Sequence, residues 1–489
     1  MSATPPAASP ALAAPPVPRA APAPDARRSL WGVLALSLLL GLVLSAAGVA
    51  LKERVVRALP AAHEAVAPPS GIRTFLDDAI DSWKPMKLAL RIHESPAGDR
   101  LWETLREFQV SGATGAAGDL SDFTETKKFQ YPLTSLLPIA ALEDAGLGSI
   151  RSLNTINLAA FGIAAAAVAL LAVLRLPAGG RAGALVVGVT ALAFALAFYP
   201  DFYALRNGNI QLWINALFAL ACLAWLGGST AAAGALIALA AMIKPQLGAL
   251  LLWAVLWRNW SFCAGFLCVA VPAALAAVAV FGLHNNLAYL EVMSTMSRLG
   301  ERLYANESIN GIAHRLADGG VEGVLTRDAD YYAPYYRSVH LATLAGGSLL
   351  TALALLPAWL RRGTPATLAD FALASICFTI ASPIVWPFHY GTLLPVYVIA
   401  LAVLLDRPRD GWSVPLLWML GASWVLAASY MPFLRLLYER PWNLAGNPHF
   451  FAALLLIAVL VQGAGLLRRG AAPARGRPDL VGGSVLAGS

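Results

Sequence analysis

Three carboxylates in one short polar segment are of the residue type that acid–base catalysis needs. Asp77, Asp78 and Asp81 lie within residues 75–83. If this segment is helical, Asp77 and Asp81 share one face at spacing i, i+4. Two carboxylates held that close raise each other's pKa, which favours a general base over an inert anion. A solvated acidic turn explains the same residues, so both interpretations stay open for this segment.

A single lysine, Lys244, interrupts a long apolar stretch of the sequence. The apolar segments on its two sides have only about thirteen residues each, and at 1.5 Å per residue each covers roughly 20 Å of a 30 Å hydrocarbon core. The turn at Lys244 is therefore expected at or below the lipid headgroups, where a lysine without a partner is costly. An anionic lipid phosphate would be a natural partner. A lysine that merely ends a helix and extends to the interface is the alternative.

The turn between residues 201 and 209 combines charge with a tight backbone bend. It contains Arg206, followed by Asn207-Gly208-Asn209. Asn-Gly is typical of a tight turn, and an arginine beside a span on the outer side of a membrane is rare. Arg206 could bind a phosphate or pair with Asp201, and the sequence favours neither.

Two further polar segments have side chains suited to sugar recognition. The first contains Asn306, Ser308 and Arg315, and the second contains Trp386 and His389. Amides and hydroxyls match sugar hydroxyls in hydrogen bonding. An ordinary polar loop, together with a structural histidine and an aromatic belt at the membrane surface, is the alternative.

Composition indicates which elements position these residues. The 489 residues are 58% hydrophobic and only 13% charged, and the apolar residues form runs too long for a globular core helix. This excludes an ordinary soluble protein. The net charge of +7 is spread over short loops. This distribution is typical of charges that set the orientation of a membrane protein, and it does not indicate nucleic-acid binding. The four cysteines lie within apolar runs without metal spacing, so neither a metal site nor a cofactor is predicted.

The apolar runs predict an all-α polytopic membrane protein with about twelve transmembrane helices. The predicted spans are 29–51, 152–174, 182–200, 210–227, 230–243, 245–257, 261–282, 339–360, 367–382, 390–405, 413–430 and 450–467. Residues 131–142 are apolar but short, which predicts a re-entrant or interfacial helix. The Ala/Pro-rich residues 1–28 and the similar residues 468–489 are predicted to be disordered cytoplasmic tails. Between them, 29–467 is predicted to be one membrane-embedded domain.

Arginine positions agree with this count. If the N-terminus is cytoplasmic, the twelve spans leave these arginines on the cytoplasmic side: Arg27, Arg28, Arg175, Arg181, Arg258, Arg361, Arg362, Arg407, Arg409, Arg468 and Arg469. Two long loops, 52–151 with short helices and 283–338, then lie outside. The polar and titratable residues gather at that extracytoplasmic face, whereas a transporter more often has them at mid-membrane.

Six short blocks, taken in order along the chain, resemble the polyprenyl-phosphate-sugar-dependent glycosyltransferases of superfamily C and, within it, glycosyltransferase family 87. The blocks are Asp81 with Gly98-Asp-Arg-Leu-Trp102, Phe129-Gln-Tyr131-Pro132, Asn207-Gly208-Asn209, Gly234 to Lys244-Pro245, Asn306-Glu-Ser-Ile-Asn-Gly-Ile-Ala-His-Arg315, and Ser382-Pro-Ile-Val-Trp386-Pro-Phe-His389. Any one block is weak, and six in the right order are strong.

The chain also departs from the family's pattern. Asp81 is followed by Ser-Trp-Lys instead of an aromatic pattern, which leaves Asp77 and Asp78 as rivals for the aligned aspartate. Tyr-Pro-Leu, Gly-Asn, Asn-Glu-Ser and His-Tyr stand where the family has Tyr-Pro-Pro, Gly-Gln, Asn-Gln-Ser and His-His. An acceptor or sugar different from those of the best-known members, which are α-mannosyltransferases, is implied.

The resemblance implies an inverting sugar transferase on the extracytoplasmic side of the inner (plasma) membrane. A carboxylate, Asp81 ahead of Asp78 and Asp77, would remove the proton of an acceptor hydroxyl as that hydroxyl attacks the anomeric carbon. The implied donor is a polyprenyl-phosphate sugar, with mannose as the family's default, and the acceptor is a glycolipid or polysaccharide. The residues expected to contact these substrates are Tyr131, Arg206, Asn209, Lys244, Asn306, Ser308, Arg315, Trp386 and His389.

A transporter or flippase of a lipid-linked saccharide is the alternative function. It would use the same basic and aromatic residues for binding, but it needs no essential carboxylate in the first outer loop. No metal is expected in the transferase, because departure of a monophosphate needs only fixed cations.

Overall fold

The computed structural model describes residues 24–58, 76–111, 129–318, 333–406, 413–437 and 442–468. Within these ranges every regular element is a helix and there is no strand, which confirms the predicted all-α class. The predicted tails lie largely outside the described residues. Helix α1 (Pro24–Ala58) begins ahead of the predicted start of the first span at residue 29.

Five helical segments in the described part of the chain are long and apolar enough to cross a membrane. They are Gly32–Lys52 within α1, α7 (Ile150–Arg175), α13 (Trp260–Phe281), α17 (Arg337–Leu360) and Pro387–Asp406, which joins η6 (Pro387–Thr392) to α19 (Leu393–Asp406). Helices α8 (Arg181–Leu196) and α9 (Tyr199–Asn207) meet at a 50° bend and make a sixth if they form one span.

The other predicted spans are shorter apolar helices. They are α10 (Gln211–Leu226), α11 (Thr230–Ala241), η5 (Pro245–Gly248) with α12 (Ala249–Leu256), α18 (Leu368–Ile380), α20 (Ser413–Ala428) and α21 (Pro448–Gly463). Each of the twelve predicted segments therefore coincides with a helix or a helix pair. Length and composition support membrane crossing for five or six of them, and a count of twelve crossings stays a prediction.

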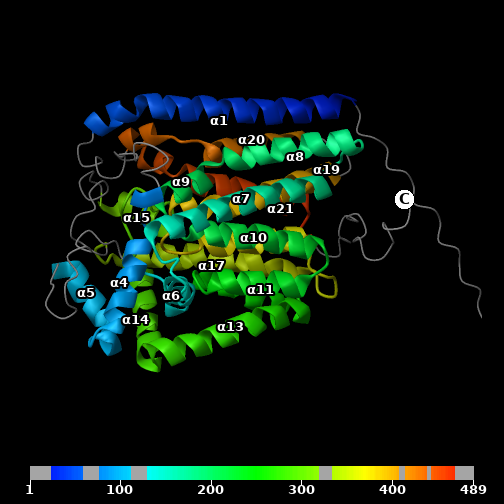
Figure 1. Cartoon of the computed structure of the whole chain (residues 1–489). Coiled ribbons are helices and arrows are strands. Elements are labelled where there is room, and N and C mark those ends of the chain that lie inside the picture. Colours follow the sequence, from blue (N-terminus) through cyan, green and yellow to red (C-terminus); the bar gives the residue numbers. More distant parts are fainter. Residues whose placement is uncertain are drawn as a thin grey trace, which may run out of the picture.

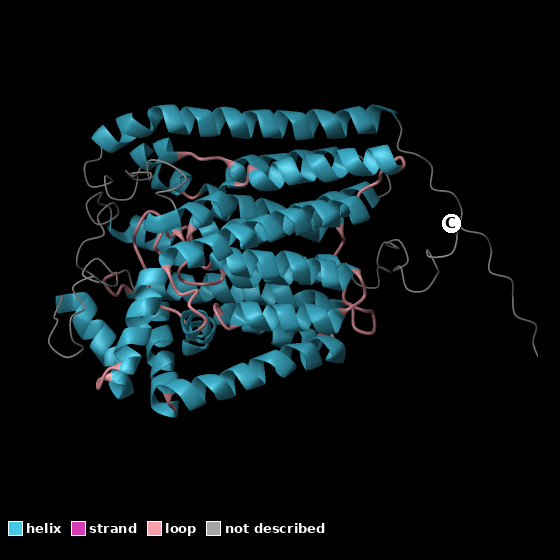
Figure 2. Ribbon diagram, in the orientation of Figure 1, coloured by secondary structure: helices cyan, strands magenta, loops and turns pink. Residues whose placement is uncertain are grey.

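The apolar helices lie side by side in one bundle, and the more polar helices gather at one of its ends (Figure 1). The helices at that end are α4 (Trp83–Glu94), η2 (Gly98–Arg100), α5 (Leu101–Ser111), η4 (Leu133–Ser135), α6 (Leu136–Asp144), α14 (Leu283–Leu299), α15 (Ile309–Asp318), η7 (Pro432–Leu437) and η8 (Trp442–Gly446). Helix α6 overlaps the predicted re-entrant or interfacial segment 131–142 and continues to Asp144, and it runs across the direction of the long helices (Figure 2).

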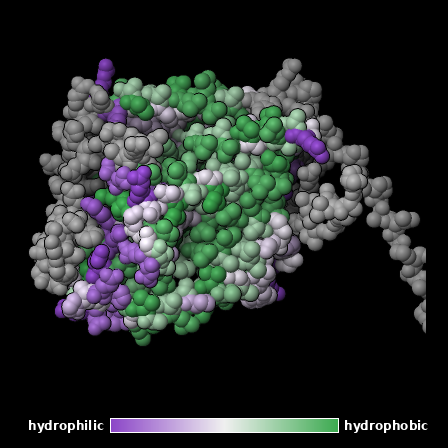
Figure 3. All heavy atoms as spheres, in the orientation of Figure 1, coloured by the Kyte–Doolittle hydropathy of each residue, from purple (hydrophilic) through white to green (hydrophobic). Residues whose placement is uncertain are grey.

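The surface of the bundle has the polarity that a lipid environment demands. Hydrophobic side chains cover most of the visible face, and hydrophilic ones concentrate at the end that carries α4 and α5 (Figure 3). Leu185, Leu275 and Leu349 are among the large apolar side chains that are more than half exposed. Such a surface is stable against hydrocarbon and unstable against water.

Helices α11 and α13 pack closely against each other, with their backbones in contact. A Cβ at Gly234 of α11 would lie 2.1 Å from the Phe262 carbonyl oxygen, and a Cβ at Gly265 of α13 would lie 1.9 Å from the Ala231 carbonyl oxygen. Small residues on both helices therefore allow the crossing, as is common between membrane helices.

Two of the arginines that were predicted to face the cytoplasm pair with carboxylates at helix ends. Arg175, at the end of α7, lies 3.6 Å from Asp406 at the end of α19. Arg361 forms a buried ion pair with Asp370, which also caps the start of α18. The cationic ends of these helices are thus held by acids of neighbouring helices.

Filling the crossing of α11 and α13 should destabilise the bundle. We expect Gly265→Val to lower the melting temperature of the detergent-solubilised protein, since overpacking costs about 1–3 kcal/mol or more. Gly162→Val is the matched control, because it also lies inside an apolar helix but has open space around it. Equal melting temperatures of the two variants would contradict the proposed packing role.

Candidate functional site

Asp81 lies where the start of α4 meets the turn between α9 and α10. Its backbone N–H donates to the Asn207 carbonyl over 2.8 Å, and the Asn209 amide donates to its carboxylate over 2.6 Å. Gly208 permits this approach, because its φ is +65° and a Cβ there would lie 2.3 Å from the Ala79 carbonyl oxygen. The Asn-Gly-Asn turn therefore orients the carboxylate.

A buried asparagine on α7 holds the same segment from another side. Asn154 accepts the indole N–H of Trp83 over 2.7 Å and donates to the carbonyls of Leu76 and Ala79 over 2.9 and 2.8 Å. The sequence analysis did not predict a role for Asn154. The pattern that could have indicated one is a carboxamide inside a long apolar run, since polar groups there need internal partners.

Buried carboxamides continue from Asn209 into the bundle. Asn209 Oδ1 accepts the backbone N–H of Gln211 over 2.9 Å, so its NH₂ group is the one that faces Asp81. Gln211 donates to Asn215 over 2.9 Å, and Asn215 donates to the buried carboxylate of Asp201 over 2.6 Å. This network, which the sequence did not predict, determines the orientation of the amide that holds Asp81.

The phenol of Tyr131 reaches the same place. Its Oη lies 3.1 Å from Ser82 Oγ, and Ser82 accepts the backbone N–H of Ile210 over 3.0 Å. Burial raises the pKa of Tyr131 and the neighbouring Asp81 carboxylate raises it further, although hydrogen bonds to Ser82 and Asn209 act the other way. Tyr131 therefore stays protonated and is available as a hydrogen-bond donor beside Asp81.

A basic pair from two distant segments lies within electrostatic reach of Asp81. Lys244, between α11 and η5, contacts Nε2 of His389 through its side-chain nitrogen. The backbone N–H of Trp386 donates to His389 Nδ1 over 2.7 Å, so a neutral imidazole carries its proton on Nε2, toward Lys244. Burial lowers the pKa of Lys244 well below its usual value, while the Asp81 carboxylate acts in the opposite direction. The pair offers N–H donors to an anion bound beside Asp81.

Two contacts place this basic pair. The Thr134 hydroxyl donates to the Met242 carbonyl over 2.7 Å, which ties the Lys244 turn to η4. The Trp386 indole N–H donates to Glu301 over 2.7 Å, so the indole of this predicted substrate-binding residue is already hydrogen-bonded within the protein.

The remaining acidic candidates and Arg206 lie differently. Asp77 and Asp78 are exposed, and Asp77 lies 3.9 Å from Arg151 in a solvent-exposed ion pair. Arg206 is half-buried on α9. Asp81, in contrast, accepts a hydrogen bond from the Asn209 carboxamide and lies within electrostatic reach of Lys244.

Three predicted substrate-binding residues are buried and support the corner at which η6 begins. Asn306 donates to the Pro383 carbonyl over 3.0 Å and accepts the Val385 N–H over 2.9 Å. Ser308 donates to the same Pro383 carbonyl over 2.7 Å, and Arg315 donates to the Asn306 carbonyl over 2.9 Å. Substrate contact by these three residues stays a prediction, and in the structure their side chains hold the backbone that leads to His389.

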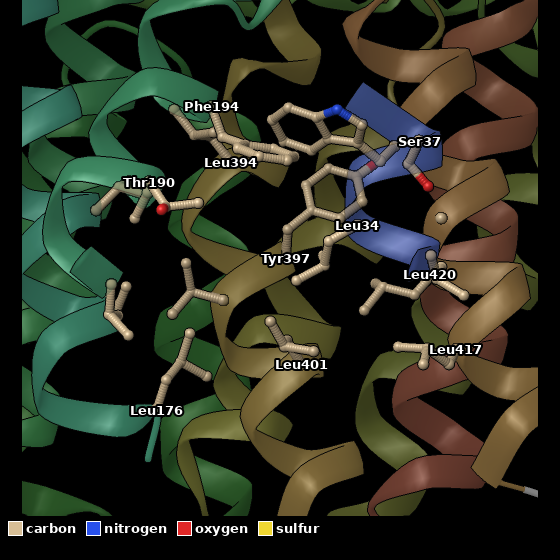
Figure 4. A pocket seen from close by; sticks show the side chains of 18 residues that line it. Leu34, Ser37, Leu176, Thr190, Phe194, Leu394, Tyr397, Leu401, Leu417 and Leu420 are labelled. Carbon is tan, nitrogen blue, oxygen red and sulfur yellow. The ribbon is translucent and has the colours of Figure 1, made fainter. Parts of the chain in front are cut away.

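A different cavity, of about 120 Å³, lies among α1, α7, α8, α19 and α20 (Figure 4). Its lining is almost entirely carbon, with polar side-chain atoms supplied by Ser37, Thr190, Tyr397 and Trp424. Its described lining holds no carboxylate or amine, so it is unsuited to acid–base chemistry. Among the residues that the structure describes, no group of three or more His, Cys, Asp or Glu side chains could hold a metal ion.

Asn154 should stabilise the folded conformation of the segment that carries Asp81. In Asn154→Leu the Trp83 indole and two carbonyls lose their partner, and each buried group left unpaired costs about 1–3 kcal/mol. We expect faster amide hydrogen exchange in residues 76–90, measured by mass spectrometry. Thr155→Ala is the control, since that hydroxyl bonds only within its own helix, to Arg151. Unchanged exchange in Asn154→Leu would show that other contacts order the segment.

Comparison with known families places the chain in one of them. Residues 129–387, more than half of the chain, match the model of glycosyltransferase family 87. No curated protein and no solved structure matched the chain. The matched range contains Tyr131, Asn209 and Lys244, whereas Asp81 precedes it and His389 follows just after it. With its bundle of apolar helices, the chain is a membrane glycosyltransferase and belongs to glycosyltransferase family 87.

Proposed function

We propose that the protein transfers a sugar from a polyprenyl-phosphate donor to an acceptor hydroxyl, with Asp81 as the general base. The observation that carries this proposal is the grouping of Asp81 with Lys244 and His389, which come from three distant parts of the chain. Sugar transfer from a phosphate needs these two kinds of group. One takes the proton of the acceptor, and the other stabilises the negative charge of the leaving phosphate.

The reaction is a single displacement at the anomeric carbon. The acceptor oxygen forms a bond to that carbon as its proton passes to the Asp81 carboxylate, and the bond between the carbon and the phosphate oxygen breaks. The bonding electrons leave with the polyprenyl phosphate, and the anomeric configuration inverts. The hydrogen bond from Asn209 orients the Asp81 carboxylate. The negative charge of this carboxylate also stabilises the positive charge that develops on the sugar ring.

Lys244 and His389 are proposed to bind the phosphate of the donor. The donor phosphodiester carries one negative charge, and the leaving polyprenyl phosphate gains a second. Both charges favour the ammonium form of Lys244, whereas burial lowers the pKa of this lysine. An ammonium Lys244 cannot accept the Nε2–H of His389, so this N–H would turn to the phosphate as a second donor, while Nδ1 is occupied by the Trp386 N–H. Donor binding would therefore charge the lysine at the place where negative charge grows during the reaction.

The position of the site at the polar end of the bundle suits a lipid-borne donor. The phosphate can lie at headgroup depth while the polyprenyl chain remains among apolar helices. We propose that this end faces the extracytoplasmic side of the inner membrane, that mannose is the sugar, and that a glycolipid or polysaccharide is the acceptor. The positive-inside pattern and the family resemblance support these assignments.

Loss of the Asp81 carboxylate should abolish transfer. We expect Asp81→Asn to lower kcat by roughly 10²–10⁴-fold, the range that general-base assistance contributes. The assay measures sugar transfer in membranes that contain polyprenyl-phosphate-mannose and a mixture of glycolipid acceptors. Asp77→Asn and Asp78→Asn should retain wild-type rates, because both carboxylates are exposed.

Other outcomes of this series would change the assignment. An inactive Asp77→Asn or Asp78→Asn variant with an active Asp81→Asn variant would move the base to the surface aspartates. If all three variants transfer sugar normally, no carboxylate of this segment is the base. If the wild type moves lipid-linked saccharide across vesicles without forming a new glycosidic bond, the protein is a flippase.

Lys244 should matter for the phosphate of the donor. We expect Lys244→Met to lower kcat/KM for the monophosphate donor by about 10²-fold, since a charge-assisted contact of about 1.5–3 kcal/mol is lost where charge develops. Lys87→Met is the matched control, because that lysine is already bound to Glu143 and to the Gly148 carbonyl. A wild-type enzyme that prefers a diphosphate donor would contradict the proposed donor class.

A further inference from the structure

A second polar cavity lies on the other side of Phe388 from the basic pair. It measures about 50 Å³, and its lining includes Tyr199, Tyr203, Tyr304, Glu307, Tyr430 and His449. These residues come from α9, from the segment before α15, from the residues after α20 and from the start of α21. None of them was predicted from the sequence to contact a substrate.

A carboxylate and an imidazole form the polar part of this cavity. The backbone N–H of His449 donates to Glu307 Oε2 over 2.9 Å, and its Nδ1 lies 2.8 Å from Glu307 Oε1. Because Nδ1 donates to the carboxylate, Nε2 of the neutral ring carries a lone pair. That Nε2 is buried and has no hydrogen-bond partner among the described residues. A buried nitrogen without a partner is costly, and a ligand that supplies a hydroxyl would satisfy it.

Aromatic rings connect the cavity to the candidate active site. Tyr199 stacks on the His449 ring at 5.8 Å between centroids. Tyr203, on the same helix, stacks on Phe388 at 6.0 Å, and Phe388 packs edge-on against His389 at 4.6 Å. One aromatic side chain thus separates the cavity from the pair proposed to bind the donor phosphate.

We propose that this cavity binds one sugar ring of the acceptor, with a ring hydroxyl donating to His449 Nε2. This inference rests on the proposed transfer reaction and names the part of the protein that recognises the acceptor. The aromatic rings offer flat apolar faces to the C–H groups of a sugar, and the imidazole offers an acceptor to its hydroxyls. The volume, enough for about three to five water molecules, fits the hydroxylated edge of one ring.

The charge of the cavity argues against the donor as its occupant. Its described lining contains no lysine or arginine, and it includes the Glu307 carboxylate. An anionic sugar phosphate would be repelled there, whereas it would be attracted by Lys244 and His389. The uncharged rings of an acceptor glycan are compatible with the Glu307 carboxylate and do not need a lysine or arginine in the lining. The Glu307 carboxylate orients His449 through its contacts with the backbone N–H and with Nδ1.

Binding of methyl α-mannopyranoside to the full-length protein in detergent tests the proposal without requiring activity. Saturation-transfer NMR should detect binding to the wild type, and His449→Phe should weaken it about fivefold to tenfold, the effect of one lost hydrogen bond. Tyr430→Leu, which removes a half-buried wall of the cavity, should weaken it as well. His340→Phe, a histidine on α17 outside the cavity, should bind as the wild type does. Melting temperatures establish that each variant is folded.

Kinetics then separate the acceptor from the donor. With polyprenyl-phosphate-mannose and a glycolipid acceptor, His449→Phe should raise the KM of the acceptor and leave the KM of the donor unchanged. A raised donor KM would overturn the acceptor assignment. Wild-type saccharide binding by both His449→Phe and Tyr430→Leu, or no binding to the wild type, would overturn the site itself. If the saccharide binds as expected but no sugar is transferred by the wild type, the proposed function fails and the binding site stands.

Discussion

The hydrogen bond from the Asn209 amide to the Asp81 carboxylate is the contact around which the candidate site is arranged. An aspartate in a long loop has no preferred direction of its own. Here the backbone of Asp81 is tied to the α9–α10 turn, and Asn154 holds the preceding carbonyls. The orientation of the Asn209 amide is in turn decided by the Gln211 N–H. Asn154, Asn209 and the Gln211 N–H thus each bind a group that also limits its neighbour.

The corner at which η6 begins has a comparable role for the basic residues. Asn306 and Ser308 satisfy the carbonyl of Pro383, and Trp386 both donates to Glu301 and determines the tautomer of His389. Asn306 and Ser308, which were predicted to contact substrate, hold the backbone of this corner. The same corner separates the basic pair from the tyrosine-lined cavity, with Phe388 between them. Rigid placement of His389 therefore depends on residues that need not touch a substrate.

The apolar bundle and the polar end are consequences of one physical requirement. Helices that contact hydrocarbon must satisfy their backbone groups internally and expose apolar side chains. Charged groups then have low energy only at the helix ends or in internal pairs such as Arg361 with Asp370. The proposed transfer of a sugar from a lipid-borne phosphate to a hydroxyl needs both environments within reach of each other. The end of the bundle provides them, because the apolar helices stop where α4, α6 and α14 begin to cover the polar residues.

Apolar runs determined the all-α class and the position of each apolar helix, because the length and hydrophobicity of a helix are local properties of the sequence. The order of the short blocks likewise predicted the family. Which aspartate lies beside Lys244 was decided by the tertiary structure, since Asp77, Asp78 and Asp81 differ little as a sequence pattern. The contacts of Asn154, the contacts of Asn306 and Ser308 with Pro383, and the pairing of Glu307 with His449 join residues from 71 to 142 positions apart. Hydrogen bonds over such separations depend on how helices pack, and no local spacing in the sequence encodes that.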